Sequence, residues 1–448
     1  MLKPSEAQDR ADALISQAKK AGADAADAIY VCDASTQVQM RLGNLEDVER
    51  SEGEEIGLRV FVGKRSATVS SSDMDPAILS ALVGRALDMA KEAPEDQFAG
   101  LAPQELLLKS EAPSIEGDDG QDPEPELLRE LALKAEDAAR SVEGVTNSEG
   151  GGASAGRSIV ALATSHGFSG AYSTSGYSLS ASVIAGAGDG MERDYAYDSV
   201  RFLEDMESAE NIGREAGERA VSRLNPVHFK SGAMPVVYDP RVGNSLLGHL
   251  VGAISGSAIA RKTSFLLDAL DTQVFDSALT IIDCPHRKRG LRSKAFDGEG
   301  LPTSKTKLID SGRLTQWIME SASARQLGLQ PTGHASRGVG GAPGVSVTNL
   351  HMGNGSVSKA DLIKDIKQGV YITELIGMGV NPVTGDYSRG ASGFLIENGE
   401  IGSPISEITI AGNLKDMFGS LVAANDLAYR YSVNVPTLRT DSMTVAGG

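Results

Sequence analysis

A chain of 448 residues is too long for one ordinary hydrophobic core, so the sequence predicts two or three domains. The formal net charge of -18 disfavours broad nucleic-acid binding, which needs a basic surface, and the two cysteines exclude a disulfide framework and suit a reducing compartment. The N-terminus is charged at once and no run of about 18 apolar residues occurs, so we expect a cytoplasmic protein without membrane contact.

The first part of the chain predicts a small domain of helices and strands. Residues 5–21 place apolar side chains at helical spacing, and residues 28–70 are strand-like. Asp75-Pro76 predicts the start of a second helix, because aspartate caps a helix and proline suits its first position. We therefore expect an N-terminal α/β domain at residues 1–92.

An acidic stretch follows at residues 93–125, in which Asp and Glu are mixed with Gly and Pro. Such a composition cannot bury a core, so it predicts a linker or a long surface loop. A helix is expected at about residues 126–142. Strands are expected within residues 145–203, where apolar and small polar residues alternate. Together these form an expected central strand-rich segment at residues 126–225.

The last part, residues 232–448, predicts a larger strand-rich domain with segregated helices. Asp239-Pro240 opens a helix after a short strand. Asn398-Gly399 predicts the clearest hairpin, because these residues accept the positive φ angles of a tight turn. A final helix is expected over residues 413–426. Runs of strands with separate helices make α+β the expected fold class.

Three glycine-rich stretches do not predict catalysis. Residues 152–156 match G-x-S-x-G, but a turn precedes them and a strand follows, which is the reverse of a nucleophile elbow. We expect a flexible hairpin turn there. Residues 338–344 and 377–382 lack the Lys-Ser/Thr of a phosphate-binding loop, and both predict loops where the backbone turns sharply or approaches another segment closely.

The histidines contain no helix-borne metal pair, because no two of the six are four residues apart. A metal site assembled from distant loops, for instance from His249, His334 and His351, stays open as an alternative. Residues 286–289 form a short basic run, His-Arg-Lys-Arg. We expect a solvated loop there and no nucleic-acid site.

Several segments carry a family resemblance. They are Gly57-Leu58-Arg59-Val60-Phe61, Leu246-Leu247-Gly248-His249-Leu250-Val251-Gly252-Ala253, Gly385-Asp386-Tyr387-Ser388-Arg389-Gly390-Ala391-Ser392-Gly393-Phe394, and residues 396–400 and 406–414. The chain resembles the TldD/TldE (PmbA) family over nearly its whole length, and the TldE/PmbA branch in particular. Residues 93–125 match least.

The resemblance implies that, in the catalytic TldD branch, the helix that corresponds to residues 246–253 carries the motif H-E-x-x-x-H. The two histidines, on adjacent turns of one helix face, bind Zn²⁺ and the glutamate acts as base for a zinc-bound water. Here Gly248, His249 and Ala253 stand at those positions, and neither glycine nor alanine has a lone pair for a metal. The cysteine ligand that TldD supplies near its C-terminus is also missing from residues 425–438. We expect no catalytic residue, metal or cofactor in this chain.

The resemblance further implies a cytoplasmic heteromeric protease in which TldD carries the zinc. TldE completes a closed chamber for unfolded or small peptides, which strand addition holds in extended form. We expect this chain to be the TldE-type subunit of such a complex, and to self-associate as a homodimer when isolated. His249 and the Ser388-Arg389-Gly390 loop are the candidates for peptide or partner contact. A turn buried in the domain core stays open as the other interpretation of that loop.

Two other functions stay open. The first is a stand-alone metallopeptidase with an unrecognised metal site, which stoichiometric zinc in the purified chain would favour. The second is a non-enzymatic interaction protein that modulates a toxin or gyrase, since the label "modulator of DNA gyrase" is attached to the family. The acidic charge gives no support to direct DNA contact.

Overall fold

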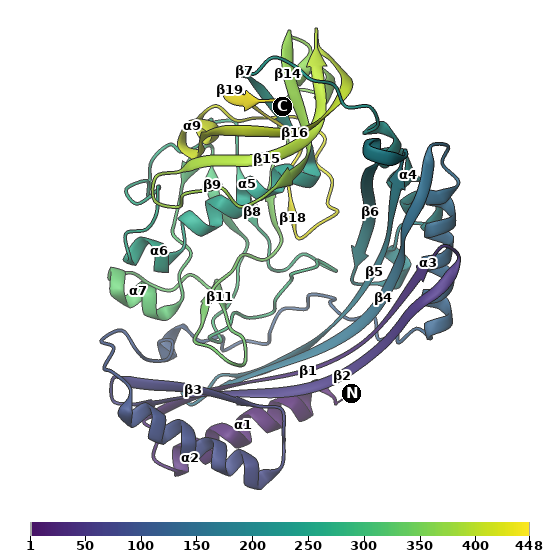
Figure 1. Cartoon of the computed structure of the whole chain (residues 1–448). Helices are drawn as coiled ribbons and strands as arrows, with labels where there is room; N and C mark the ends of the chain where they lie inside the picture. Colours follow the sequence, from purple (N-terminus) through teal and green to yellow (C-terminus); the bar gives the residue numbers. More distant parts are fainter. Residues whose placement is uncertain (1, 448) are drawn as a thin grey trace.

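The computed structural model describes residues 2–447, and of residue 442 only the backbone. Its N-terminal half is built on one long antiparallel sheet of order β3-β2-β1-β4-β5-β6, which curves around the rest of the chain (Figure 1). We call it the cradle sheet. Its strands are β1 (Ala25–Arg41), β2 (Asn44–Val62), β3 (Arg65–Ser71), β4 (Val145–Thr164), β5 (Ser169–Ala185) and β6 (Glu192–Val200). The sheet therefore runs across the expected boundary at residues 93–125.

Four helices cover the convex face of the cradle sheet (Figure 1). They are α1 (Pro4–Lys20), α2 (Pro76–Glu92), α3 (Pro125–Arg140) and α4 (Ala209–Ser222). The first three begin with proline, whose fixed φ suits the first helical turn. Small residues let α3 and α4 pack closely, because a Cβ at Gly213 of α4 would lie 2.1 Å from the carbonyl oxygen of Ala135 in α3.

Residues 152–156 lie inside β4, so the expected hairpin turn is wrong. Glycine is needed in this strand because α3 crosses it closely. A Cβ at Gly151 would lie 2.2 Å from the carbonyl oxygen of Ala132. The glycines of the motif itself, Gly152 and Gly156, instead face Gln39 and Ala34 of the neighbouring strand β1.

The segment between α2 and α3 contains only the short helix η1 (Gln104–Leu106) among its described elements, but it is not loosely solvated. Leu107 and Ile115 are buried. Asp118 accepts a hydrogen bond from Arg157 Nε at 2.7 Å, and Asp119 accepts one from the Tyr177 hydroxyl at 2.6 Å. The expectation that this composition buries nothing is corrected: the acidic side chains find donors on the cradle sheet.

The C-terminal body, residues 232–447, lies within the curve of the cradle sheet (Figure 1). One of its sheets has the order β16-β15-β14-β7-β19-β17, and β16 also pairs with β19, so five strands close on each other. These strands are β7 (Gly232–Tyr238), β14 (Gln368–Ile376), β15 (Asp386–Glu397), β16 (Glu400–Asn413), β17 (Val422–Ala423) and β19 (Leu438–Ala446).

Shorter elements complete this body. A second sheet has the order β10-β9-β8-β13-β18, and β11 pairs with β12. Their bounds are β8 (Ile281–Asp283), β9 (Thr306–Asp310), β10 (Arg313–Leu314), β11 (Ala335–Ser336), β12 (Gly344–Val345), β13 (Leu350–Met352) and β18 (Val433–Asn434). The helices are α5 (Pro240–Ala253), α6 (Gly256–Ala260), α7 (Ser321–Leu327), α8 (Lys359–Ile363) and α9 (Leu414–Gly419).

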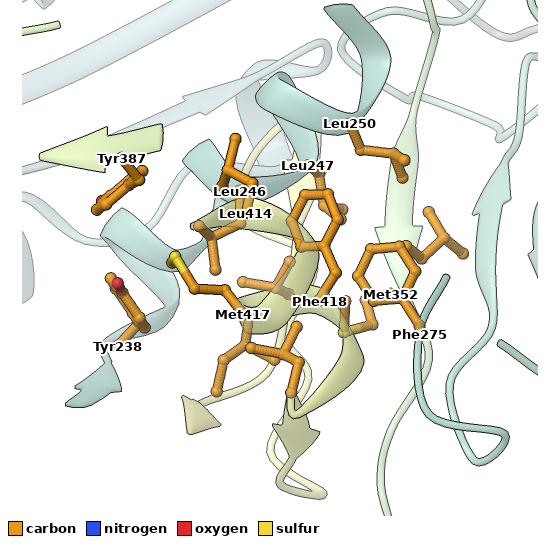
Figure 2. Close-up of a cluster of buried hydrophobic side chains, with 14 of the residues drawn as sticks. Tyr238, Leu246, Leu247, Leu250, Phe275, Met352, Tyr387, Leu414, Met417 and Phe418 are labelled. Atoms are coloured by element: carbon orange, nitrogen blue, oxygen red, sulfur yellow. The ribbon is translucent and has the colours of Figure 1, made fainter. Parts of the chain in front are cut away.

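The core of this body forms around α5. Figure 2 shows Leu246, Leu247 and Leu250 of α5 among aromatic and thioether side chains from neighbouring segments. Phe275 and Phe418 stack with ring centroids 4.5 Å apart. Fully burying side chains of this size contributes about 2 kcal/mol each, so α5 is held firmly by one side.

The α+β class is confirmed, with separate helices around sheets in which most strand pairs are antiparallel and the pairs β7–β14 and β13–β18 are parallel. The Asn398-Gly399 hairpin is also confirmed: both residues have positive φ, 50° and 83°, and they join β15 to β16. The final helix is shorter than expected, because α9 ends at Gly419 and Val422–Ala423 pair with β19 instead. Among the residues described, no helix is long and apolar enough to cross a membrane.

Candidate functional site

One side of α5 faces away from the core and borders a cleft of about 390 Å³ between β6 and the C-terminal body. We call it the α5 cleft. Its lining includes Arg193, Asp194, Tyr195, Arg223, Arg241, Asn244, Ser245, Glu374 and Arg389. Asp239 caps α5 by accepting the Arg241 backbone N–H at 2.9 Å, and Pro240 fixes the first turn. The side of α5 that carries Ser245 continues to the exposed Gly248 three residues later.

The two positions expected to be relics of metal ligands differ in their surroundings. Gly248 is exposed, and a Cβ there would meet nothing within 4 Å. Ala253 is only 4% exposed and belongs to the core. Positions five residues apart on a helix point about 140° away from each other. The expectation that they share one helix face is therefore corrected.

The residues present at this helix do not fit a zinc ion. Zinc in proteins is held by Cys, His, Asp or Glu, and Gly248 and Ala253 offer none of these donors. The intervening His249 lies beside the cationic Arg389, which disfavours a metal cation there. In the part of the chain that the structure describes, no group of three or more His, Cys, Asp and Glu could hold a metal.

The three histidines weighed as a dispersed metal site have separate neighbours. His334 is buried, with Nδ1 3.0 Å from Thr332 Oγ1 and Nε2 3.5 Å from Asp283. His351 contacts Arg287 instead, and His249 contacts Tyr387. The structure therefore does not bring these histidines together as one ligand set.

His249 packs edge-on against Tyr387, with ring centroids 6.0 Å apart. Its Nε2 is buried and has no hydrogen-bond partner among the described residues. Burial lowers the pKa of His249, and the charge of Arg389 lowers this pKa further. The imidazole is therefore neutral at physiological pH.

Ser388-Arg389-Gly390 forms part of strand β15, so the expected loop or turn is wrong. The strand pairs with β14 on one side and with β16 on the other. Because side chains alternate along a strand, the buried Tyr387 and the partly buried Arg389 share one face, while the exposed Ser388 lies on the other. Of the four candidates, the structure brings together only His249 and Arg389.

Sequence reasoning missed an ionic network in the α5 cleft. Arg241 donates two hydrogen bonds, of 2.8 and 2.9 Å, to the carboxylate of Asp194. Arg223 lies 2.7 Å from Glu374 and 3.2 Å from Glu192. Burial raises the pKa of Asp194, but the hydrogen bonds and charge of Arg241 outweigh it, and the pKa is lowered overall. No sequence motif marks these residues among 60 acidic and 42 basic ones.

A second cleft, of about 380 Å³, lies between β6 and the loops at residues 287–291 and 429–431. We call it the arginine–tyrosine cleft. The Arg287 guanidinium lies over the Tyr429 ring, 3.9 Å from its centroid. Its Nη2 is 3.3 Å from Nδ1 of His351. The basic run is therefore only partly the solvated loop expected from sequence: the Lys288 side chain is 72% exposed, but Arg287 is packed.

Comparisons with known proteins place these features in context. The chain matches family models described as PmbA/TldA metallopeptidase domain 1 at residues 26–90, central domain at 118–224 and C-terminal domain at 231–447. It is 39% identical to the metalloprotease PmbA of Escherichia coli O157:H7 over 412 residues, covering 92% of this chain and 89% of that protein. It is 36% identical to a PmbA homolog of Haemophilus influenzae over 433 residues, covering 96% and 94%.

Solved structures agree over the same extent. A protein from Bacteroides thetaiotaomicron described as a modulator of DNA gyrase superposes with a TM-score of 0.90, at 27% identity and with 99% of each chain covered. TldE from Thermococcus kodakarensis superposes with a TM-score of 0.87, covering 98% of this chain and 100% of that one. At 20% identity, the second likeness speaks for the fold alone.

Proposed function

The chain belongs to the PmbA/TldA metallopeptidase family, and on that basis we propose that it is the TldE-type, non-catalytic subunit of a TldD/TldE metallopeptidase. The complex degrades or processes unfolded peptides, and the TldD-type partner supplies the zinc. The observation that carries the proposal is the chemistry of α5. Gly248 is exposed without a side chain and Ala253 is a buried methyl group, so this helix offers no pair of metal donors.

In this proposal the chain contributes surface to the chamber and contacts the peptide. The α5 cleft supports this role, because Arg389 of β15 lines it, and the partly buried His249 of α5 lies beside that arginine. β6 is the outermost strand of the cradle sheet and borders the cleft. An outermost strand offers backbone groups to an extended peptide.

A cytoplasmic location is part of the proposal. Both cysteines, Cys32 and Cys284, are free thiols, which suits a reducing compartment. In isolation the chain is proposed to form a homodimer, because the two subunit types are related. Measuring the mass of the purified chain in solution tests for the homodimer. The same measurement after mixing with a TldD-type partner tests for the complex.

The deciding experiment measures cleavage of an unfolded peptide by this chain, by a TldD-type partner, and by the mixture. Each sample is assayed as purified, after chelation, and after zinc is added back. Cleavage by the mixture above the level of either protein alone, lost on chelation and restored by zinc, is the expected result. Arg389→Gln is expected to lower cleavage by the mixture, whereas Ser388→Ala, on the opposite face of the same strand, serves as the matched control.

Two outcomes would overturn the proposal. Chelator-sensitive cleavage and stoichiometric zinc in this chain alone would establish a stand-alone metallopeptidase. Failure to associate with any TldD-type chain, together with recovery of gyrase or a toxin from a pull-down, would establish an interaction protein instead.

A further inference from the structure

The lining of the arginine–tyrosine cleft contains more basic than acidic residues, although the net charge of the chain is -18. Five basic and four acidic residues line it. The four acids already have partners: Asp198 accepts the N–H groups of Ser199 and Glu207, Asp205 pairs with Arg289, Glu207 accepts from Ser208 and Asn211, and Glu215 pairs with Arg219. None of these carboxylates is left over for the remaining cations.

Three of the five cations are likewise paired with acids. Lys288 pairs with Glu116, Arg289 with Glu204 and Asp205, and Arg430 with Glu215. The other two, Arg201 and Arg287, have no carboxylate partner among the described residues. Arg201 donates to the carbonyl oxygens of Ser175 and Leu291, so its terminal nitrogens are engaged. Among the described residues, Arg287 is therefore the lining cation that has neither a carboxylate nor a backbone carbonyl as its acceptor.

Arg287 is held in position without being neutralised. One face of its guanidinium lies on the Tyr429 ring, and Nη2 reaches Nδ1 of His351. His351 is 7% exposed and sits in β13, so it is a fixed acceptor. Burial, then the charge of Arg287, lower the pKa of His351 to about 4, so the imidazole is neutral at pH 7 and Nδ1 can accept. A fixed guanidinium loses little conformational entropy when it binds an anion.

The surroundings of Arg287 fit a ligand that carries one negative charge next to uncharged groups. Its planar fork matches the two oxygens of a carboxylate. Tyr197 and Tyr431 pack against each other in the lining, with ring centroids 5.6 Å apart. The exposed parts of Tyr197 and Tyr429, which are 40% and 57% exposed, offer apolar surface to neighbouring peptide groups. A chain of phosphates fits less well, because it carries several negative charges and the cleft offers one guanidinium without a carboxylate or carbonyl acceptor.

We propose that the arginine–tyrosine cleft binds a carboxylate of an extended peptide, and that Arg287 is the residue that holds it. This inference rests on the proposed function, since the peptide would be a substrate of the metallopeptidase complex. It adds a preference for substrates that carry an acidic side chain or a free C-terminus. Residues of β6 and residues 429–431, just before β18, line this cleft, and Figure 1 shows β6 and β18 near each other.

The test measures binding of a short, fluorescently labelled, unstructured peptide to the full chain without its partner. The peptide has one internal glutamate and a free C-terminus, and three derivatives replace the glutamate by glutamine, amidate the C-terminus, or do both. The derivative that binds more weakly than the parent peptide shows whether the cleft binds the glutamate carboxylate or the C-terminal carboxylate. Arg287→Gln is expected to weaken binding of the acidic peptide at least about tenfold, the usual loss for a hydrogen-bonded charge pair.

Arg289→Gln is the matched control, because it removes the same charge from the same cleft but from an arginine already paired with Glu204 and Asp205. It is expected to weaken binding less than about threefold. Arg287→Lys, which keeps the charge but loses the fork, is expected to fall between the two. It replaces the glutamine variant if thermal denaturation shows that variant to be unfolded.

Equal losses in the Arg287 and Arg289 variants would overturn the proposal, because long-range charge would then explain them. Equal affinity for the acidic and the doubly neutral peptide would overturn it too, as would tighter binding of a single-stranded oligonucleotide than of any peptide. Partner-dependent cleavage without a carboxylate preference removes only this inference. Carboxylate binding without partner-dependent cleavage removes the proposed function and leaves the cleft as a peptide site.

Discussion

Arg241, in the first turn of α5, donates two nearly equal hydrogen bonds, of 2.8 and 2.9 Å, to the buried carboxylate of Asp194 in β6. The pair joins the C-terminal body to the outermost strand of the cradle sheet. The Asp194 side chain is 3% exposed and that of Arg241 is 11% exposed. Removing one partner of such a pair leaves the other buried and uncompensated.

Asp194→Asn is therefore expected to lower the free energy of unfolding by about 3 kcal/mol. Asp189→Asn, at an exposed site in the turn before β6, is the control and is expected to change it by less than about 0.5 kcal/mol. Urea unfolding measures both. The pKa of Asp194 is lowered in the folded state, so its contribution is present above the unfolded pKa of about 4 and is lost as the pH falls below it. Wild type and variant should converge in acid.

For Asp297 we expect the free energy of unfolding to change with pH in the opposite direction. Burial, then the charge of Glu299, raise the pKa of Asp297 to about 7. The unfolded chain releases this proton near pH 4, so between about pH 4 and 7 the folded chain binds more protons and stability falls as the pH rises. The full difference is on the order of 4 kcal/mol. Urea unfolding at a series of pH values should show a flatter profile for Asp297→Asn, and parallel profiles would contradict the assignment.

Gly248 and Ala253, the two positions proposed as relics of metal ligands, should respond differently to substitution by histidine. Gly248→His places a side chain in open space and replaces glycine within a helix, so it is expected to be neutral or stabilising by up to about 0.5 kcal/mol. Ala253→His forces a polar ring into the core and is expected to cost about 2 kcal/mol or more. Thermal denaturation distinguishes them. With Glu at His249 added, we expect no stoichiometric zinc by elemental analysis, since the two positions point apart.

Arg389 should control the titration of His249. Because its charge is the second cause of the lowered pKa of His249, after burial, Arg389→Gln is expected to raise that pKa without restoring its ordinary value. NMR titration of the imidazole measures the shift directly. Ser388→Ala, on the other face of β15, should leave it unchanged, and a shift of equal size in that control would show that the two side chains are not separated as the strand alternation requires.

Local signals in the sequence predicted the elements that local chemistry determines. Asp239-Pro240 marked the start of α5, and Asn398-Gly399 marked the hairpin, because a cap and a positive φ act within a few residues. Glycine and serine residues gave a wrong prediction where the structure depends on packing against distant segments. Residues 152–156 look like a turn, yet they lie within β4, and Gly151 beside them lets helix α3 approach the strand.

The candidate site was predictable only in part. The resemblance pointed to His249 and Arg389, which do meet, but it could not show that Ser388 faces away, since that depends on strand alternation within β15. Arg241 and Asp194 are 47 residues apart in sequence, and Arg287 and His351 are 64 apart. These contacts depend on how β6 packs against the C-terminal body, and no spacing of residues in the sequence predicts that packing.

The cradle sheet also has a consequence for synthesis of the chain on the ribosome. β1 pairs on one side with β2, which follows within a few residues, and on the other with β4, from Asp27 opposite Thr164 to Met40 opposite Gly151. Until β4 emerges, β1 has an open edge that can join a neighbouring nascent chain. A fragment ending at residue 92 keeps that edge, so we expect truncations there to aggregate.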